Sequence, residues 1–198
     1  MPEAVEQASL RDAGDRMRLG ALLLVRHCGF HQDTKFSPWF EPSRLILGRV
    51  VEAAKAVHRD GDAHGADLAG LQAAVQEVLE ESDPEGPPFE TEIVDHLVFA
   101  DEVLEFLLAP DEPELLGQAL ERADELAEAH EEMGREEYEG SDDWEPAPLF
   151  SLEAEARTLD VEGDPGSAAA LARSEAFARA YAEVIEKCYS DDDAGRAE

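Results

Sequence analysis

The sequence predicts an all-α protein, a single helical bundle of about seven helices. Apolar residues recur at the 3.6-residue spacing of amphipathic helices in segment after segment, and no segment shows the strict alternation of a half-buried strand. Clusters of Gly, Pro, Ser and Asp separate these periodic segments and mark the turns between helices. A length of 198 residues fits one domain with its own core.

The first half of the chain is predicted to form three helices. Residues 1–8 are assigned to a flexible tail, and Ser9 is expected to cap a first helix that ends at Gly29. A loop with several aromatic residues follows, and Ser43 then begins a second helix. A third helix is expected at about 66–81, where Leu and Val recur at helical spacing.

The second half begins after a break rich in Pro and is predicted to form four more helices. They are expected at about 92–108, 114–138, 149–161 and 166–189. The 92–108 segment has the widest apolar face, so we place it at the centre of the bundle. The predicted organisation is therefore one helical domain over residues 9–189, followed by an acidic tail at 190–198.

The chain is strongly acidic, with 48 Asp and Glu against 16 Lys and Arg and a formal net charge of −32. Such a surface repels nucleic acids and anionic membranes, so neither is expected as a partner. A basic protein partner is compatible with the charge. A bias of the genome or of a saline habitat is the competing interpretation, because Lys and Ile are scarce and Asn is absent.

Several features indicate a cytoplasmic protein. The first ten residues are acidic and polar, unlike a signal peptide, and the longest apolar run is too short to span a bilayer. Cys28 and Cys188 are far apart in the sequence, and we expect both to be reduced, buried thiols. The sequence leaves the oligomeric state open.

Four carboxylates form the best catalytic candidate. Glu77 and Glu80 are three residues apart near the end of one predicted helix, and Glu92 and Asp95 are three apart at the start of the next. Residues three apart share a helix face, so two antiparallel helices could direct all four toward one Mg²⁺ ion. This looks like the pattern of the all-helical nucleotide pyrophosphohydrolases of the MazG kind. A chain this acidic contains such pairs by chance, and solvated helix faces are the competing interpretation.

Two loops carry aromatic residues that are candidates for contact with a ligand or partner. Phe36, Trp39 and Phe40 fall in the loop after the first helix, and Trp144 stands alone in the loop before the 149–161 helix. Loops on rigid scaffolds often carry binding residues. The competing interpretation is that these rings close the ends of the core.

The layout of the chain from Leu10 to Tyr189 resembles the YjaG-like bacterial proteins, an all-helical family of unknown function. The segments that carry the resemblance are LGALLLVRHCGF, SRLILGRVVEAAKAV, FETEIVDHLVFADEVLEFLLAPDEPELLGQALERADELAEAHEE and LFSLEAEARTLDV. This chain departs from the family in its higher acidity and in an inserted GDPGSAAA before the last helix. The resemblance implies an all-α fold and supplies no catalytic residues.

Three functional hypotheses follow from the sequence. The first is a non-enzymatic, protein-binding or regulatory domain without a cofactor, because phosphate-binding, dinucleotide-binding, nucleophile-elbow and zinc-protease motifs are absent. The second is a Mg²⁺-dependent pyrophosphohydrolase that uses the four carboxylates. The third is an acidic immunity or inhibitor protein that masks a basic partner.

Overall fold

The computed structural model describes residues 2–32, 41–82, 90–138 and 145–190, and within these ranges the fold is all-α. The helices are α1 (Pro2–Ser9), α2 (Ala13–Cys28), the 3₁₀ helix η1 (Gly29–Gln32), α3 (Glu41–Asp60), α4 (Leu68–Glu81), α5 (Glu90–Leu108), α6 (Pro113–Tyr138), α7 (Leu149–Glu162) and α8 (Ala168–Ser190). The predicted helical bundle is confirmed, with eight α-helices in the described ranges where about seven were expected.

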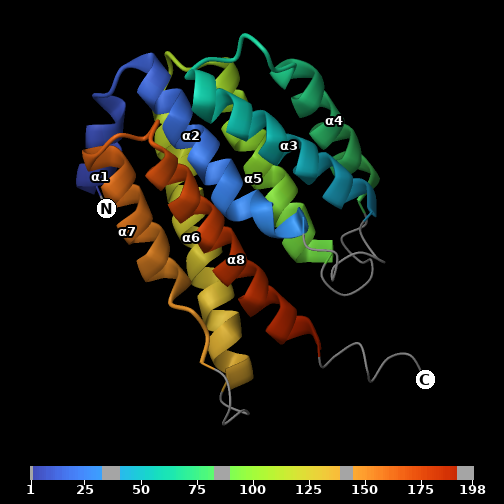
Figure 1. The fold of residues 1–198 in the computed structure, drawn as a ribbon. Helices are drawn as coiled ribbons and strands as arrows, with labels where there is room; N and C mark the ends of the chain where they lie inside the picture. Colours follow the sequence, from blue (N-terminus) through green and yellow to red (C-terminus); the bar gives the residue numbers. More distant parts are fainter. Residues whose placement is uncertain (1, 33–40, 83–89, 139–144, 191–198) are drawn as a thin grey trace.

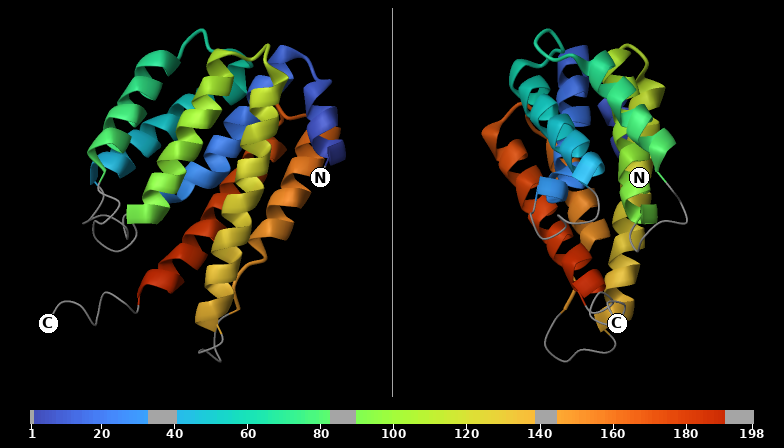
Figure 2. Two further views of the ribbon diagram at one scale, coloured as in Figure 1. Left: turned by 180° about the vertical axis from the view of Figure 1, so that it is seen from behind. Right: turned by 90° about the vertical axis from the view of Figure 1, so that its right-hand side faces the viewer.

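The helices pack in two layers (Figures 1 and 2). One layer contains α3, α2 and α8 side by side, and the other contains α4, α5, α6 and α7 in that order. The short helix α1 packs against α6 and α7 at one side of the bundle. None of the helices in the described ranges combines the length and the apolar character needed to cross a bilayer.

The centre of the bundle is shared by α2 and α5. Every residue of α2 from Leu19 to Cys28 is buried, because this helix has neighbours in both layers. The buried residues of α5 include Leu97, Phe99, Val103 and Phe106, as the wide apolar face of this helix predicts. The two helices cross closely at Gly20, where an added Cβ would lie 2.9 Å from the ring of Phe106.

The start of the chain differs from the prediction. The residues assigned to a tail form α1 instead, and Ala8 at the end of this helix is fully buried. The helical cap that was expected at Ser9 is supplied by Asp12, whose carboxylate accepts a hydrogen bond from the backbone N–H of Asp15 at 2.9 Å. Helix α1 therefore replaces the predicted tail, and α2 begins four residues after the predicted cap. The extent of a single domain over 9–189 stays a prediction.

Helix α8 also begins differently from the prediction, which started the last helix at residue 166. Its first residue is Ala168, and the hydroxyl of Ser167 accepts a hydrogen bond from the backbone N–H of Ala170 at 3.2 Å. The preceding Asp164 closes the turn by accepting from the N–H of Gly166 at 2.9 Å. The acidic tail lies outside the described residues, apart from Ser190, which ends α8.

Candidate functional site

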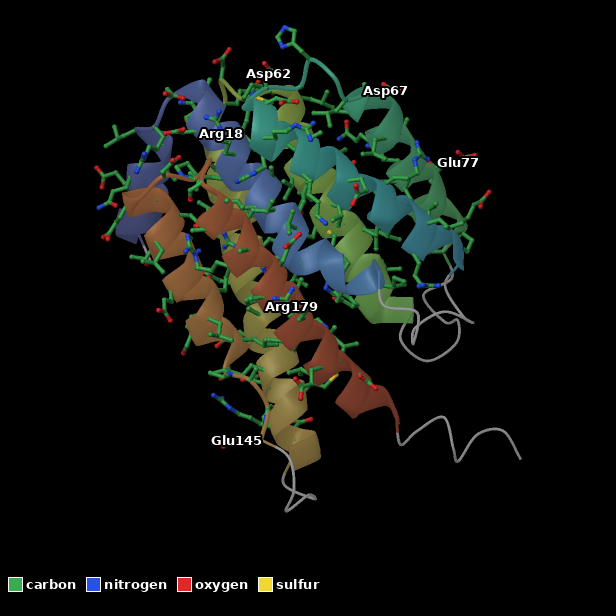
Figure 3. All side chains as sticks on the ribbon, in the orientation of Figure 1. Arg18, Asp62, Asp67, Glu77, Glu145 and Arg179 are labelled. Carbon is green, nitrogen blue, oxygen red and sulfur yellow. The ribbon has the colours of Figure 1, made fainter. Side chains whose placement is uncertain are left out.

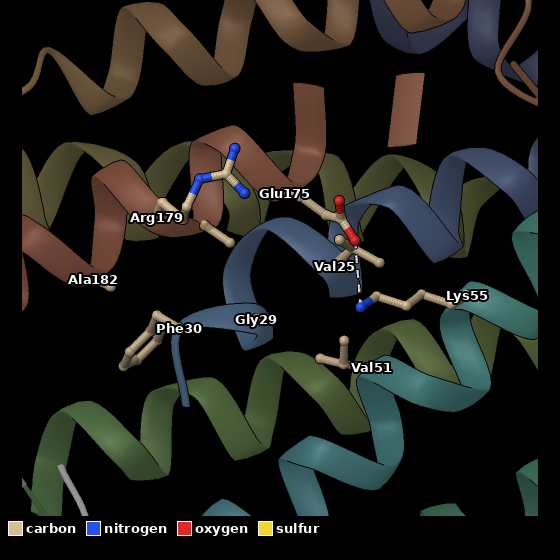
Figure 4. Close-up of a pocket in the computed structure, with 9 residues that line it drawn as sticks. Val25, Gly29, Phe30, Val51, Lys55, Glu175, Arg179 and Ala182 are labelled. Carbon is tan, nitrogen blue, oxygen red and sulfur yellow. Dashed lines mark ion pairs between the residues drawn. The ribbon is translucent and has the colours of Figure 1, made fainter. Parts of the chain in front are cut away.

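A pocket of about 350 Å³ lies where the end of α2 and η1 meet α3 and α8 (Figure 4), and we call it the α3–α8 pocket. Six of its nine lining residues are uncharged and small or apolar, namely Val25, Gly29, Phe30, Val51, Ala178 and Ala182. Its charged lining residues are Lys55, Glu175 and Arg179. An apolar pocket with a few polar groups is the usual form of a binding site.

Gly29 fixes how closely α2 approaches α8 at this pocket. Its backbone is right-handed, with φ −67° and ψ −29°, so the chain continues from α2 into η1 without the left-handed turn that ends many helices. An added Cβ at this position would lie only 2.9 Å from the Cβ of Ala178 on α8. Glycine is therefore required here for space, and the close approach forms one wall of the pocket.

The charged lining residues lie on α3 and α8. Lys55 on α3 pairs with Glu175 on α8, with 3.3 Å between Nζ and Oε1, and also lies 3.6 Å from Glu52. Figure 4 shows this pair crossing from one helix to the other, with Arg179 on α8 beside it. Arg179 is exposed and makes no hydrogen bond or ion pair with any residue that the structure describes.

Phe30 separates the pocket from a buried aromatic cluster. Its ring lines the pocket and is centred 4.8 Å from the ring of His96 and 5.3 Å from that of Tyr181. The Tyr181 hydroxyl lies 3.0 Å from His96 Nε2 and 2.7 Å from His130 Nδ1. These contacts join α5, α6 and α8 behind the pocket, so its inner wall is held by three helices.

A second buried group holds α7 against the opposite layer. The Arg26 guanidinium on α2 donates to Glu153 Oε1 at 2.8 Å, to Asp160 and to the Ser174 hydroxyl at 3.2 Å. Glu153 also contacts His27 Nε2 at 3.3 Å, and Arg173 donates to Asp160. The buried members of this Arg26 network are Arg26, His27, Glu153, Asp160 and Ser174.

Burial and neighbouring positive charges act in opposite directions on the pKa values of the two acids in the Arg26 network. Burial alone would raise the pKa of Glu153, but the charge of Arg26, the hydrogen bond from His27 and the charge of Arg157 outweigh it and lower that pKa to about 2. Burial raises the pKa of Asp160, although Arg26 and Arg173 act in the opposite direction. Cys28 nearby is a buried thiol whose pKa is raised by burial, which makes it a weak nucleophile.

The Arg26 guanidinium and the carboxylates of Glu153 and Asp160 pair with one another and are closed off from solvent. Glu153 and Asp160 have no exposed surface, and Arg26 is 1% exposed. Nearby, Arg157 on α7 donates to Asp124 on α6 at 3.0 Å and to the carbonyl of Leu120 at 3.2 Å. These contacts tie α7 to α2, α6 and α8, whereas the α3–α8 pocket is open to solvent.

The structure does not bring the predicted carboxylate set together as far as it is described. Glu77 and Glu80 are exposed on α4, and Figure 3 shows Glu77 at the outer edge of that helix. Asp95 on α5 pairs with Arg122 on α6 at 3.3 Å. Glu92 belongs to α5, but its side chain lies outside the described residues. Among described side chains, no three His, Cys, Asp or Glu are grouped to hold a metal ion.

The aromatic candidates cannot be placed. Phe36, Trp39, Phe40 and Trp144 all lie outside the described residues, so their predicted role in binding stays a prediction. The same holds for the side chain of Cys188, whereas Cys28 is buried as expected.

Sequence reasoning missed the Arg26 network and the pocket. Arg26 and Glu153 are 127 residues apart, so spacing alone could not pair them. A signal was present nevertheless, because Arg26 and His27 interrupt the most apolar run of the chain. A charged residue in a fully buried segment requires a buried partner of opposite charge.

In comparisons with known proteins, no protein-family model, no curated protein and no solved structure matches the chain. The resemblance to the YjaG-like proteins therefore remains a prediction from the sequence.

Proposed function

We propose that this chain is a non-enzymatic helical domain that binds a protein partner, and that the α3–α8 pocket receives a side chain of that partner. The pocket carries this proposal, because it combines apolar side chains with an arginine that has no described partner. Apolar pockets that accept one anchoring side chain are typical centres of protein interfaces. The proposal includes the cytoplasmic location expected from the sequence.

The pairing of two buried acids supports a binding role. The two buried acids that most resemble a catalytic pair are Glu153 and Asp160. Both accept hydrogen bonds from arginines, Glu153 from Arg26 and Asp160 from Arg26 and Arg173. A catalytic acid or base must reach a substrate proton within hydrogen-bond distance. These carboxylates have no exposed surface from which to do so.

Site-specific photo-crosslinking in the native host tests the proposal. A benzophenone amino acid at Glu175, on the pocket rim, is compared with the same group at Glu77, which is exposed on α4. We expect a discrete crosslinked partner from position 175 and none from position 77. In a third arm, Ala182→Trp fills the pocket and should abolish the crosslink. Crosslinks that are equal at both positions, or insensitive to Ala182→Trp, would refute the proposed docking site.

The acidic inhibitor hypothesis is favoured by one observation. Glu121, Glu125, Glu128, Glu132 and Glu136 are all exposed on α6 and follow each other at steps of three or four residues. This spacing places them on one helix face. A partner that binds through this face would be basic, and its affinity would fall steeply as salt is added. A partner anchored mainly in the pocket would show a weaker salt dependence, so a salt titration separates the two hypotheses.

A further inference from the structure

The pocket carries two of the few cations of this acidic chain. Its charged lining residues are Lys55, Arg179 and Glu175, in a protein with a net charge of −32. Lys55 is already engaged by two carboxylates, those of Glu175 and Glu52. Arg179 is therefore the positive charge that remains available at the rim.

Arg179 is unusual among the basic residues of the protein. Of the Lys and Arg side chains that the structure describes, Arg49 and Arg179 make no hydrogen bond or ion pair, while the others contact a carboxylate, a carbonyl or another partner. Arg49 does not line the pocket, whereas Arg179 does. An arginine fork beside an apolar cavity matches a planar carboxylate that is attached to an apolar group.

The size of the pocket limits what can enter it. A volume of about 350 Å³ is near the lower end of the range for small-ligand sites, roughly 300–1,000 Å³. One large side chain fits such a space better than a helix or an extended strand. The walls formed by Val25, Phe30 and Val51 favour an aromatic or branched aliphatic group.

We propose that the α3–α8 pocket binds an apolar residue that carries its own carboxylate, as the C-terminal residue of a partner protein does, with Arg179 pairing with that carboxylate. This inference rests on the proposed function and specifies the chemistry that the partner presents. The apolar side chain enters between α3 and α8. The carboxylate stays at the rim, where it replaces water around the guanidinium.

The overall negative charge does not prevent this pairing. Charges beyond about 8–10 Å are largely screened at physiological salt, whereas a pair in direct contact is screened less. Added salt therefore weakens the long-range repulsion more than the local attraction. Binding of the anionic residue should stay constant or strengthen slightly with ionic strength, the opposite of what a basic ligand on the acidic surface would show.

The test uses two small probes of the same shape. N-acetyl-L-phenylalanine carries the carboxylate, and N-acetyl-L-phenylalaninamide replaces it with a neutral amide. Each is titrated into ¹⁵N-labelled protein while the backbone signals of Gly29, Ala178 and Ala182 are followed. The full chain is used as wild type, Arg179→Gln and Arg49→Gln. The Arg49 variant removes the same charge from an exposed position outside the pocket.

We expect the acid to shift the three pocket signals and to bind roughly three- to fivefold more tightly than the amide, the size expected for a partly exposed ion pair. Arg179→Gln should remove this preference by weakening the acid alone, and Arg49→Gln should retain it. Equal affinities for acid and amide, or absence of shifts at the pocket with either probe, would overturn the inference.

The outcomes also separate this inference from the proposed function. If the crosslinked partner is found but acid and amide bind equally, the binding function stands and the carboxylate is not recognised. If the acid is preferred but no partner crosslinks at position 175, the ligand chemistry stands and the protein-binding function fails.

Discussion

Helices α4 and α7 are both fourteen residues long and both end in Glu, yet they bury different kinds of side chain. On α4 the buried residues are Leu68, Leu71 and Val75, and the acids are exposed. On α7 the buried set includes Glu153, Arg157 and Asp160, while Leu159 remains 45% exposed. The apolar pattern thus determines which face of α4 is buried. The buried face of α7 is determined instead by its ion pairs with Arg26 on α2, Arg173 on α8 and Asp124 on α6.

The buried ions on α7 suggest a role in specificity. Leu159 and Asp160 are neighbours in sequence. If hydrophobic burial alone decided how α7 packs, the leucine would be buried and the aspartate exposed. The observed orientation satisfies Arg26, which has no other described carboxylate partners than Glu153 and Asp160. We infer that these ion pairs select one rotation of α7 about its axis, a role that polar groups have in some helical proteins.

The comparison predicts its largest effect at Glu153. Glu153→Ala should lower the free energy of unfolding by roughly 3–5 kcal/mol, because it leaves part of the buried Arg26 charge uncompensated. Glu77→Ala on α4 should change it by less than about 0.5 kcal/mol, because Glu77 is exposed. Urea denaturation of both variants measures the difference. A cost below about 1 kcal/mol at Glu153 would show that the network does not hold α7.

A leucine-to-alanine substitution in each helix tests which apolar side chains are buried. Leu71→Ala on α4 should cost roughly 2–5 kcal/mol, since Leu71 is buried and its loss leaves a cavity. Leu159→Ala on α7 should cost less than about 1 kcal/mol, because that side chain is half-exposed and loses few contacts. Similar costs for the two variants in urea denaturation would contradict the assigned orientations.

These two helices also show what the sequence could predict. Apolar spacing and breakers located α4 and α7 to within two residues. They also predicted five inward residues on α4, of which three are buried and two are partly buried against the core: Leu68, Leu71 and Val75, then Val78 and Leu79. The inward face of α7 was not predictable in this way, because its partners lie far away in the sequence. Helix α1 was missed because its segment contains few apolar residues, and only its packing on α6 and α7 explains the burial of Ala8.

The candidate site was less accessible to sequence reasoning than the fold. The α3–α8 pocket combines η1 with residues of α3 and α8 that are more than a hundred positions apart, and its shape depends on the contact of Gly29 with Ala178. The sequence offered Gly29 as a helix end, which is correct, but the reason for glycine is the neighbouring helix. Such a requirement becomes visible only once the helices are packed.

The pH dependence of stability should also distinguish the two helices. The folded pKa of Glu153 is about 2, against an ordinary value of 4.5, so its ionised form stabilises the fold above about pH 4.5. This contribution, about 3 kcal/mol by linkage, is lost as the pH falls from 4.5 through 2. The raised pKa of Asp160 has the opposite sign and offsets part of the loss.

Glu153→Gln is the variant that isolates this effect. Unfolding free energies of wild type and Glu153→Gln, measured from pH 6 to the lowest pH at which both fold, should converge as the pH falls below about 4.5. Glu80→Gln on α4 serves as the control, and its curve should stay parallel to that of the wild type because Glu80 is exposed. A constant difference between wild type and Glu153→Gln over this range would mean that Glu153 titrates normally.

The smallest effect is expected for Mg²⁺ on the exposed carboxylates of α4. Glu77 and Glu80 face solvent, and Asp95 is paired with Arg122, so we expect no shared site for the ion. An occupied site would stabilise the fold by mass action, by about 2.7 kcal/mol at one hundred times its Kd, which raises the melting temperature by several degrees. Melting curves with and without MgCl₂ at constant ionic strength, for wild type and for Glu80→Gln with Asp95→Asn, should instead show the same small shift. Ca²⁺ serves as the control for general screening by a divalent ion.

If Mg²⁺ stabilises the wild type specifically and the double variant loses that response, the four carboxylates form a metal site. The pyrophosphohydrolase hypothesis would then replace the binding function, and a screen of nucleotide substrates would follow.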